Sequence, residues 1–484
     1  MNAPAASTEI DPHLASSVAT NAGWLTVAQA VRRLLRLGVL FLGARLLGIE
    51  RFGEYALLLT VVELVALVTG FGYGDFLTRE IARQPEIAWR LQKRVTQIRL
   101  AYLVPCVGGA FLLLKILRFP GPLVLNAVLL SLSLIPRVIS ESAQGVMKGL
   151  QKFRPLLWIE LVQGSTLLAV ALLLLLKGFG VKGMIAAEIL GAVAGALTSI
   201  LAVVQFLKFT GSILPGFSKV ARSMIAFNIY PVIATVYDRV DVVMLSKLVG
   251  NIATGIYSVP YRVFASLSII PYGVMGALLP VFSSSEVNQE TRQNCSRAMK
   301  FLYLAALLVV LITLAFARPV VLAVLGQSYY GSIITIKVLA WASIPMFLNY
   351  ALNTLLLASH KEKIFIWTAS ICTVFNISAN LLLIPRFSYV GAAVATLLTE
   401  LLLLGQNYFL ITKFLGEPIF PKNSTKITLA FAVMLASFVL LRRWIPEVLA
   451  GAMVCAVFAA FAAGTSKGLL RGPKAIGNWL PNAR

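Results

Sequence analysis

The chain consists largely of fourteen apolar stretches joined by short polar connections. They lie at residues 24–47, 53–78, 95–117, 121–146, 155–176, 182–207, 220–245, 251–283, 298–317, 330–358, 363–385, 388–412, 425–441 and 446–464. A helix of about 20 apolar residues crosses the hydrocarbon core of a bilayer. Backbone polar groups in that core need partners within the chain, and the stretches are far longer than barrel strands. The sequence therefore predicts an all-α, polytopic membrane protein with about 14 transmembrane helices.

The composition supports residence in a membrane. Hydrophobic residues make up 59% of the chain and charged residues 13%, with a mean hydropathy of +0.86. The formal net charge of +23 would indicate a nucleic-acid partner in a soluble protein. Here Lys and Arg gather in alternate loops, near residues 79–94, 148–154, 208–222, 292–300, 361–363 and 413–426, and in the tail at 467–484. The positive-inside rule places those loops and both termini in the cytoplasm, so we expect membrane lipids and no nucleic acid as partners.

An internal repeat divides the chain. Residues 44–55 (ARLLGIERFGEY) align with residues 246–257 (SKLVGNIATGIY) at an offset of 202, which pairs Gly53 with Gly255. Further pairs, at offsets between 202 and 209, are Tyr55 with Tyr257, Lys152 with Lys361, Trp158 with Trp367 and Gly183 with Gly391. The repeat covers six spans, and because six is even, it predicts two pseudo-symmetric six-helix bundles that lie the same way up in the membrane.

The repeat also gives the predicted domain organisation. Residues 1–23 form a cytoplasmic N-terminal lead that does not resemble a signal peptide. Residues 24–210 form the N-terminal bundle and residues 211–416 the C-terminal bundle. Residues 417–484 hold the last two spans and a cytoplasmic tail. The connections are short, so we expect no inserted soluble domain.

Three segments carry a family resemblance, namely ARLLGIERFGEYAL at 44–57, YDRVDVVMLSKLVGNIATGIYSVPYRV at 237–263 and NLLLIPRFSYVGAAVATLLTE at 380–400. They resemble the polysaccharide flippase (polysaccharide transporter) branch of the multidrug/oligosaccharidyl-lipid/polysaccharide exporter superfamily. The resemblance implies two bundles around a central cavity that moves a polyprenyl-pyrophosphate-linked oligosaccharide across the bacterial inner membrane by alternating access. It implies a role in O-antigen, capsule or exopolysaccharide biosynthesis, with a polymerase and glycosyltransferases of the pathway as partners.

Two further features belong to this resemblance. Family members with helices 13 and 14 can use them to line a groove for the lipid tail, which is our expectation for the last two spans. The chain departs from the family pattern at Arg386, Phe387 and Ser388, which stand where many relatives have a glycine in the turn after the proline. We expect this departure to affect only a loop.

Basic side chains within the spans indicate where a ligand binds. An ionisable group in a span costs about 2.5 to 3.5 kcal/mol, so it faces a cavity or a partner. In the first span, Arg33 and Arg36 continue a polar stripe at helical spacing with Arg32 beside it. Guanidinium groups suit bidentate contacts with a pyrophosphate. The predicted substrate-binding residues are Arg32, Arg33, Arg36, Arg137, Lys148, Arg262, Lys337, Asn349 and Asn353.

Acidic side chains within the spans are candidates for ion coupling. By analogy with antiporters of the superfamily, the residues that could carry a proton or a sodium ion are Glu63, Glu141, Asp238 and Asp241. A structural interpretation stays open for the charged groups, with salt bridges between helices and snorkelling at span ends. In it, Arg137 pairs with Glu141, Arg239 pairs with Asp241, and three further carboxylates are satisfied packing residues, Glu160, Glu188 and Glu400.

Several functions lack the residues that they need. There is no phosphate-binding G-x-x-x-x-G-K-[ST] loop, no Ser, His and acid constellation and no metal-spaced cluster, so we predict no cofactor, no metal and no enzyme activity. A peptidoglycan lipid-precursor flippase remains an alternative because it shares the fold and the charge pattern. A cation-coupled multidrug exporter is a second alternative, although it should prefer an acidic cavity.

Overall fold

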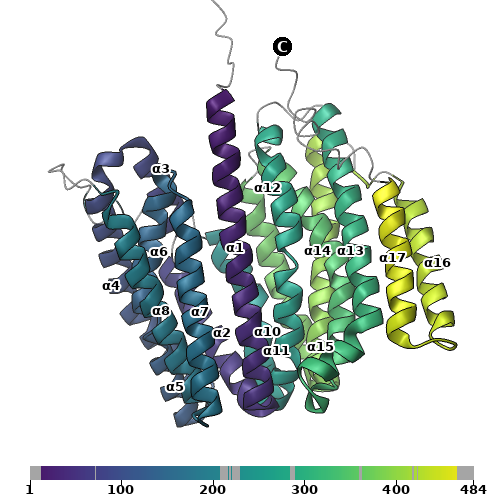
Figure 1. Ribbon diagram of the computed structural model, residues 1–484, viewed down its shortest axis with the longest axis horizontal. Coiled ribbons are helices and arrows are strands. Elements are labelled where there is room, and N and C mark those ends of the chain that lie inside the picture. Colours follow the sequence, from purple (N-terminus) through teal and green to yellow (C-terminus); the bar gives the residue numbers. More distant parts are fainter. Residues whose placement is uncertain are drawn as a thin grey trace, which may run out of the picture.

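The computed structural model describes residues 12–70, 72–207, 216, 220, 229–283, 289–358, 362–416, 419–421 and 423–465. Over these residues the chain is helical and forms no strand (Figure 1). Each of the fourteen predicted stretches, as far as it is described, coincides with one helix or two consecutive helices, which confirms the all-α prediction. The predicted lead is already helical from Pro12 onward. The predicted boundary between residues 210 and 211 and the tail beyond residue 465 lie outside the described residues.

The first half of the chain forms helices α1 to α8. Their bounds are α1 Pro12–Leu47, α2 Ile49–Gly70, α3 Tyr73–Arg83, the short 3-10 helix η1 Pro85–Ile87, α4 Ala88–Ile116, α5 Gly121–Ser131, α6 Leu134–Gly149, α7 Arg154–Leu176 and α8 Gly180–Val204. Two predicted stretches are each divided into two helices. The stretch at 53–78 breaks at Gly72, whose φ is +60°, and the stretch at 121–146 breaks between Ser131 and Leu134.

The second half forms the remaining helices. Their bounds are α10 Ile229–Leu248, α11 Asn251–Ser266, α12 Ile269–Ser283, α13 Gln289–Val324, the 3-10 helix η2 Gln327–Tyr329, α14 Ser332–Ala358, α15 Glu362–Leu415, α16 Ser424–Leu441 and α17 Glu447–Thr465. The long α15 contains the two predicted spans at 363–385 and 388–412, which a turn separates at Ser388, with φ 53° and ψ −133°. The prediction that the departure at residues 386–388 affects only a loop is therefore wrong, because the two spans are joined through one strained residue, Ser388, with no loop between them.

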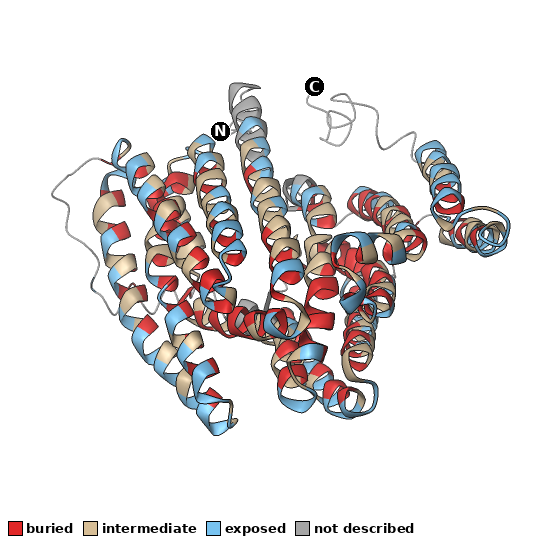
Figure 2. Ribbon diagram, turned by 60° about the horizontal axis from the view of Figure 1, so that its bottom comes forward, coloured by how far each residue is buried: buried red, intermediate tan, exposed pale blue. Residues whose placement is uncertain are grey.

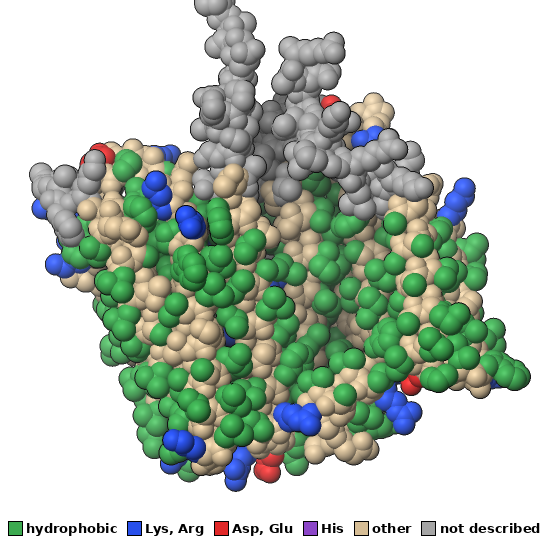
Figure 3. Space-filling model, in the orientation of Figure 1, with side chains coloured by type: hydrophobic (Ala, Val, Ile, Leu, Met, Phe, Trp, Pro, Cys, Tyr) green, Lys and Arg blue, Asp and Glu red, His purple; other side chains and the backbone are tan. Residues whose placement is uncertain are grey.

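The outer surface fits a bilayer. Ten helical segments among the described residues are long and apolar enough to cross a membrane, and the divided α15 counts once among them. Apolar side chains cover the middle of the face in Figure 3, while Lys and Arg lie toward its two ends. Large apolar side chains point outward, as at Val104 and Leu201, which are 75% and 77% exposed. The chain is therefore a multi-pass membrane protein.

Buried side chains lie between the helices and not on their outer faces (Figure 2). One cluster unites α1, α2 and α4 to α8, and it extends into the second half through Val259 on α11, Ala317 on α13 and Ile333 on α14. A second unites α1, α3, α4, α6, α7 and α8 at one end of the first half. A third joins α10 to α15, and a fourth packs α16 and α17 against α13. The first cluster therefore crosses the boundary between the halves, and the last two helices attach to the second half.

The halves meet where α2 crosses α11, at the lower end in Figure 1. A Cβ atom on Gly53 would overlap the carbonyl oxygen of Asn251, and one on Gly255 would overlap that of Ile49. Positions 49 and 251 differ by 202, as do positions 53 and 255, so the repeat makes the same contact twice. Only glycine permits this close approach of two backbones. Nearby, Tyr329 donates a 3.0 Å hydrogen bond to the carbonyl oxygen of Ala44.

Candidate functional site

A cavity of about 590 Å³ opens between helices of both halves. Its walls come from α1, α2, α3, α6 and α7 of the first half and from α10 and α11 of the second. Seven lining residues are basic, and three are acidic. The basic residues are Arg32, Arg33, Arg36, Arg137, Lys148, Arg239 and Arg262. Because basic groups outnumber acidic ones, the cavity favours an anionic occupant.

Glu188 on α8 organises the first group of these arginines. Its side chain is 1% exposed and accepts hydrogen bonds from Arg36 Nη1 at 2.6 Å and from Arg137 Nη2 at 2.8 Å. Tyr55 donates a third hydrogen bond at 2.9 Å. One buried carboxylate thus holds two guanidinium groups at the cavity wall, since a buried charge needs several close partners to be tolerated. Glu188 is therefore a positioning residue and not only a packing residue.

Glu63 on α2 makes a second junction, and this one joins the two halves. Arg262 on α11 donates a 3.1 Å hydrogen bond to Glu63 Oε1, and Arg239 Nε on α10 lies 3.2 Å from Oε2. A further contact between the halves comes from Arg33 on α1, which donates to the Ser266 carbonyl oxygen on α11 at 3.0 Å. The basic lining thus also ties the halves together.

Arg33 differs from the arginines around it. Its Nη1 donates only to neutral oxygens, the Ser266 carbonyl and Ser268 Oγ, and no carboxylate of the described residues lies within 4.0 Å. Arg32, by contrast, lies 3.8 Å from Glu160. The guanidinium charge of Arg33 is therefore the least compensated of the three arginines predicted on α1.

Neither of the two ion pairs within one helix that the structural interpretation predicted is formed. Arg137 pairs with Glu188, while Glu141 accepts a 2.6 Å hydrogen bond from Arg99, a fully buried arginine whose guanidinium carbon lies 3.5 Å from the Tyr73 ring centre. An arginine four residues before a glutamate is in the weaker order for a pair within one helix, and a buried guanidinium on a neighbouring helix is the stronger partner.

The other expected pair, Arg239 with Asp241, is also not formed, because Arg239 reaches Glu63. Asp241 is 2% exposed, and its carboxylate accepts hydrogen bonds from the Tyr257 hydroxyl and from the Val242 amide. Asp238, close by, accepts a hydrogen bond from Tyr261 through its backbone carbonyl. Residues 239 and 241 point to different helices, since neighbours two apart in a helix do not share a face.

Three predicted binding residues, all on α14, do not line the cavity: Lys337, Asn349 and Asn353. Asn349 donates a 2.9 Å hydrogen bond to Glu400 Oε2 and accepts one of 3.0 Å from Asn407. Tyr237 donates to the other oxygen of Glu400 at 2.7 Å. These polar side chains form a closed cluster inside the second half. The remaining predicted binding residues all line the cavity.

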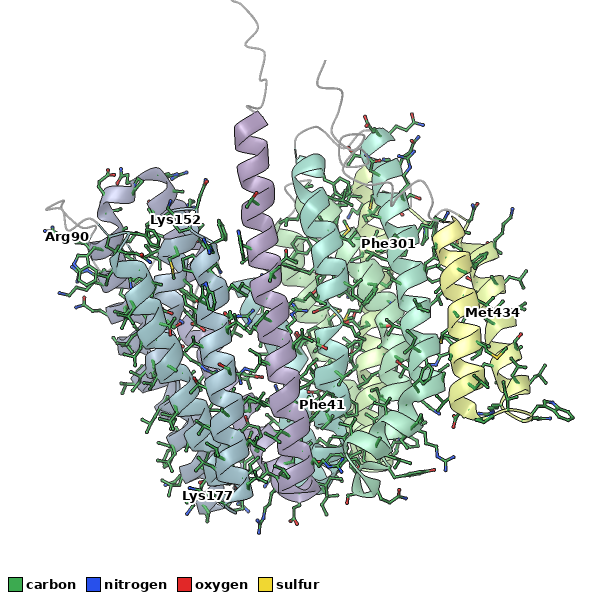
Figure 4. The ribbon with its side chains drawn as sticks, in the orientation of Figure 1. Phe41, Arg90, Lys152, Lys177, Phe301 and Met434 are labelled. Carbon is green, nitrogen blue, oxygen red and sulfur yellow. The ribbon has the colours of Figure 1, made fainter. Side chains whose placement is uncertain are left out.

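Charged residues lie toward both ends of the helices in Figure 4, with Arg90 and Lys152 at the upper end and Lys177 at the lower. The sequence analysis gave Arg239 and Glu188 structural roles only and named Tyr55 only as part of the repeat, whereas the structure places all three at the site. The repeat carried a signal for one of them, since it pairs Tyr55 with Tyr257, and both tyrosines donate to buried carboxylates. The fold and the site define a polytopic membrane protein whose two helical bundles enclose a basic cavity.

The family model described as polysaccharide biosynthesis protein matches residues 18–286, which is more than half of the chain. The chain therefore belongs to this family. It is 24% identical over 378 residues to the probable low-salt glycan biosynthesis flippase Agl15 of Haloferax volcanii, covering 75% of this chain and 77% of that protein. It is 22% identical over 328 residues to a putative O-antigen transporter of Shigella flexneri, covering 65% and 78%.

Solved structures share the fold. The lipid II flippase MurJ in an inward closed conformation matches with a TM-score of 0.65 at 15% identity, over 91% of this chain and 99% of that one. An inward-facing multidrug resistance MATE family transporter of the MOP superfamily matches with a TM-score of 0.64 at 13% identity, over 80% and 98%. At these identities the similarity shows a shared fold only, and an argument about the substrate must come from the residues of the site.

Proposed function

We propose that this protein is a flippase that moves a polyprenyl-pyrophosphate-linked oligosaccharide across the bacterial inner membrane by alternating access, for O-antigen, capsule or exopolysaccharide biosynthesis. The family match and the glycan-transport names of its relatives support this assignment. The observation that carries it is the excess of basic side chains in a cavity between two bundles. In the proposed orientation both termini are cytoplasmic.

The proposed roles follow from the geometry. Arg33 offers a guanidinium with no carboxylate partner among the described residues, which suits a pyrophosphate oxygen. The other proposed head-group contacts are Arg32, Arg36, Arg137, Lys148 and Arg262. Lys337, Asn349 and Asn353 remain predicted contacts for a conformation in which α14 turns toward the cavity.

Ion coupling is the second part of the proposal. Among the four candidates, Glu63 and Glu141 each accept a hydrogen bond from an arginine, so a transported cation would compete with that partner. Asp241 has only neutral donors in the described structure, and Asp238 takes part in no ion pair there. This contrast favours the two aspartates of α10 over the two glutamates as carriers of a proton or a sodium ion.

Two alternatives predict different results. A flippase for the peptidoglycan lipid precursor fits the MurJ-like fold, and its loss should be lethal. A cation-coupled multidrug exporter fits the MATE-like fold, but the basic lining disfavours cationic compounds. A polymerase and glycosyltransferases of a glycan pathway are the proposed partners.

Deletion of the gene tests the proposal. We expect viable cells that lack a surface polysaccharide and accumulate its lipid-linked precursor, with recovery on expression of the wild-type protein. Arg33→Ala at equal protein level should restore little glycan, while Arg443→Ala in the exposed turn before α17 should restore it fully. Lethality with accumulation of the peptidoglycan precursor would replace the proposal with the first alternative, and an unchanged glycan would refute it.

A further inference from the structure

A second cavity, of about 550 Å³, lies at one end of the first half and is separate from the basic cavity. Its walls come from α1, the α6–α7 connection, the start of α7 and the end of α8. The lining residues include Lys152, Arg154, Trp158, Ala202 and Phe206. None of the lining residues is acidic, and nothing in the proposed transport mechanism uses them.

This cavity opens on the opposite face of α7 from the basic cavity. Glu160 and Gln163 line the basic cavity, whereas Arg154 and Trp158, one turn apart, line the second one. Trp158 is 58% exposed, so it lies on the surface that faces the surrounding lipid. The second cavity is therefore a cleft in the bilayer-facing wall of the first half.

The two basic residues of the cleft have no acidic partner in the described structure. Lys152 makes a cation–π contact, with its Nζ 5.8 Å from the Phe206 ring centre, and neither it nor Arg154 takes part in an ion pair there. Figure 4 shows Lys152 near the upper ends of the helices, and the basic loops and Trp side chains place it at the level of the lipid head groups. Two uncompensated cations at that depth attract a phosphodiester.

Backbone hydrogen bonds hold the connection that carries Lys152 against the end of α6. The Lys152 amide donates to the Met147 carbonyl oxygen at 2.8 Å and the Gln151 amide donates to that of Lys148 at 3.0 Å, which closes the end of α6. Gln151 has a φ of +57°, a conformation that usually requires glycine. The backbone strain at Gln151 fixes the direction in which Lys152 leaves the helix.

We propose that this cleft binds one anionic phospholipid of the surrounding bilayer, with its head-group phosphate between Lys152 and Arg154 and an acyl chain along Trp158 and Ala202. The charge of the cleft selects an anionic over a zwitterionic head group, and the apolar wall below it suits a chain. The repeat pairs Lys152 and Trp158 with Lys361 and Trp367, and Trp367 is 73% exposed; Lys361 lies outside the described residues.

Binding of radiolabelled phosphatidylglycerol and phosphatidylcholine to the purified protein in mixed micelles tests this proposal without any transport step. The wild-type protein should hold about one phosphatidylglycerol molecule that phosphatidylcholine does not displace. Lys152→Gln with Arg154→Gln should lower the preference for phosphatidylglycerol by about tenfold or more. Lys152→Arg with Arg154→Lys, which keeps both charges, should retain most of it.

Lys413→Gln with Lys426→Gln is the matched control. It removes two exposed basic residues near the end of α15 and the start of α16, away from the cleft, and should bind phosphatidylglycerol like the wild type. Equal losses in the cleft and control variants would overturn the proposal, because the preference would then reflect net charge alone. Displacement by millimolar inorganic phosphate would also overturn it, since the site would then bind a soluble anion rather than a lipid.

Discussion

The two halves of the protein share a backbone plan and differ in the chemistry of their interiors. Tyr55 in the first half donates to Glu188, and its repeat partner Tyr257 contacts Thr396, which stands at the position of Glu188 after an offset of 208. In the first half this position is a carboxylate that holds two arginines at an open cavity. In the second half it is the neutral hydroxyl of Thr396, which contacts the Tyr257 hydroxyl.

The difference shows what the repeat preserves. The contacts between backbones, such as those at Gly53 and Gly255, are made twice with the same geometry. Most of the charged side chains that line the cavity belong to the first half, and the second half contributes Arg239 and Arg262. The duplicated bundle thus gives both halves the same backbone arrangement, while their side chains differ: a basic cavity is lined mainly by the first half, and buried aspartate and amide groups lie in the second.

The largest expected effect on stability comes from removing the carboxylate of Glu188, whose counterpart in the second half is the neutral Thr396. Glu188→Ala should lower the free energy of unfolding by about 3 kcal/mol, because Arg36 and Arg137 lose their common partner in a buried setting. Thr396→Val, at the equivalent position, should cost about 1 kcal/mol, the worth of one neutral hydrogen bond. Chemical unfolding of both variants in detergent micelles measures the difference, and equal costs would show that the halves are not distinct in this way.

The crossing of α2 and α11 should respond symmetrically. Gly53→Ala and Gly255→Ala should each cost about 1 to 3 kcal/mol, since a methyl group cannot fit against the facing carbonyl oxygen. The double variant should cost less than the sum, because both changes open one contact. Gly108→Ala on α4, where no atom lies within 4 Å, should leave stability unchanged or raise it slightly. Unequal effects of the two glycine changes in thermal unfolding would break the proposed symmetry.

The smallest effect concerns a turn that the halves make with different residues. Gly180 has a φ of +56°, and Ser388, its counterpart at an offset of 208, has a φ of 53°. Ser388→Gly should stabilise the protein by about 1 kcal/mol, because a side chain at that backbone conformation is strained. Gly180→Ser should have the opposite effect on the midpoint of thermal unfolding. A loss of stability in Ser388→Gly would contradict this account of the turn.

The sequence was sufficient for the helices and for part of the site. Helical spacing predicted that Arg33 and Arg36 share a stripe, and the cavity contains both. It could not predict Glu188 as the partner of Arg36, since that contact depends on how α8 packs against α1. For the same reason, the sequence could not predict that Asn349 forms hydrogen bonds with Glu400 and Asn407. Ser388 was noticed in the sequence, but its strain became visible only in the backbone.

The most direct test of the proposal that the basic cavity binds an anion is flipping of a labelled polyprenyl-pyrophosphate-linked oligosaccharide in proteoliposomes. Arg33→Gln should lower the rate by about tenfold or more, the worth of one charge-assisted hydrogen bond. Arg443→Gln, in the exposed turn before α17, removes the same charge away from the cavity and should keep the rate within about twofold of wild type, since it loses no contact of that kind. A normal rate in Arg33→Gln, or an equal loss in both variants, would contradict the account.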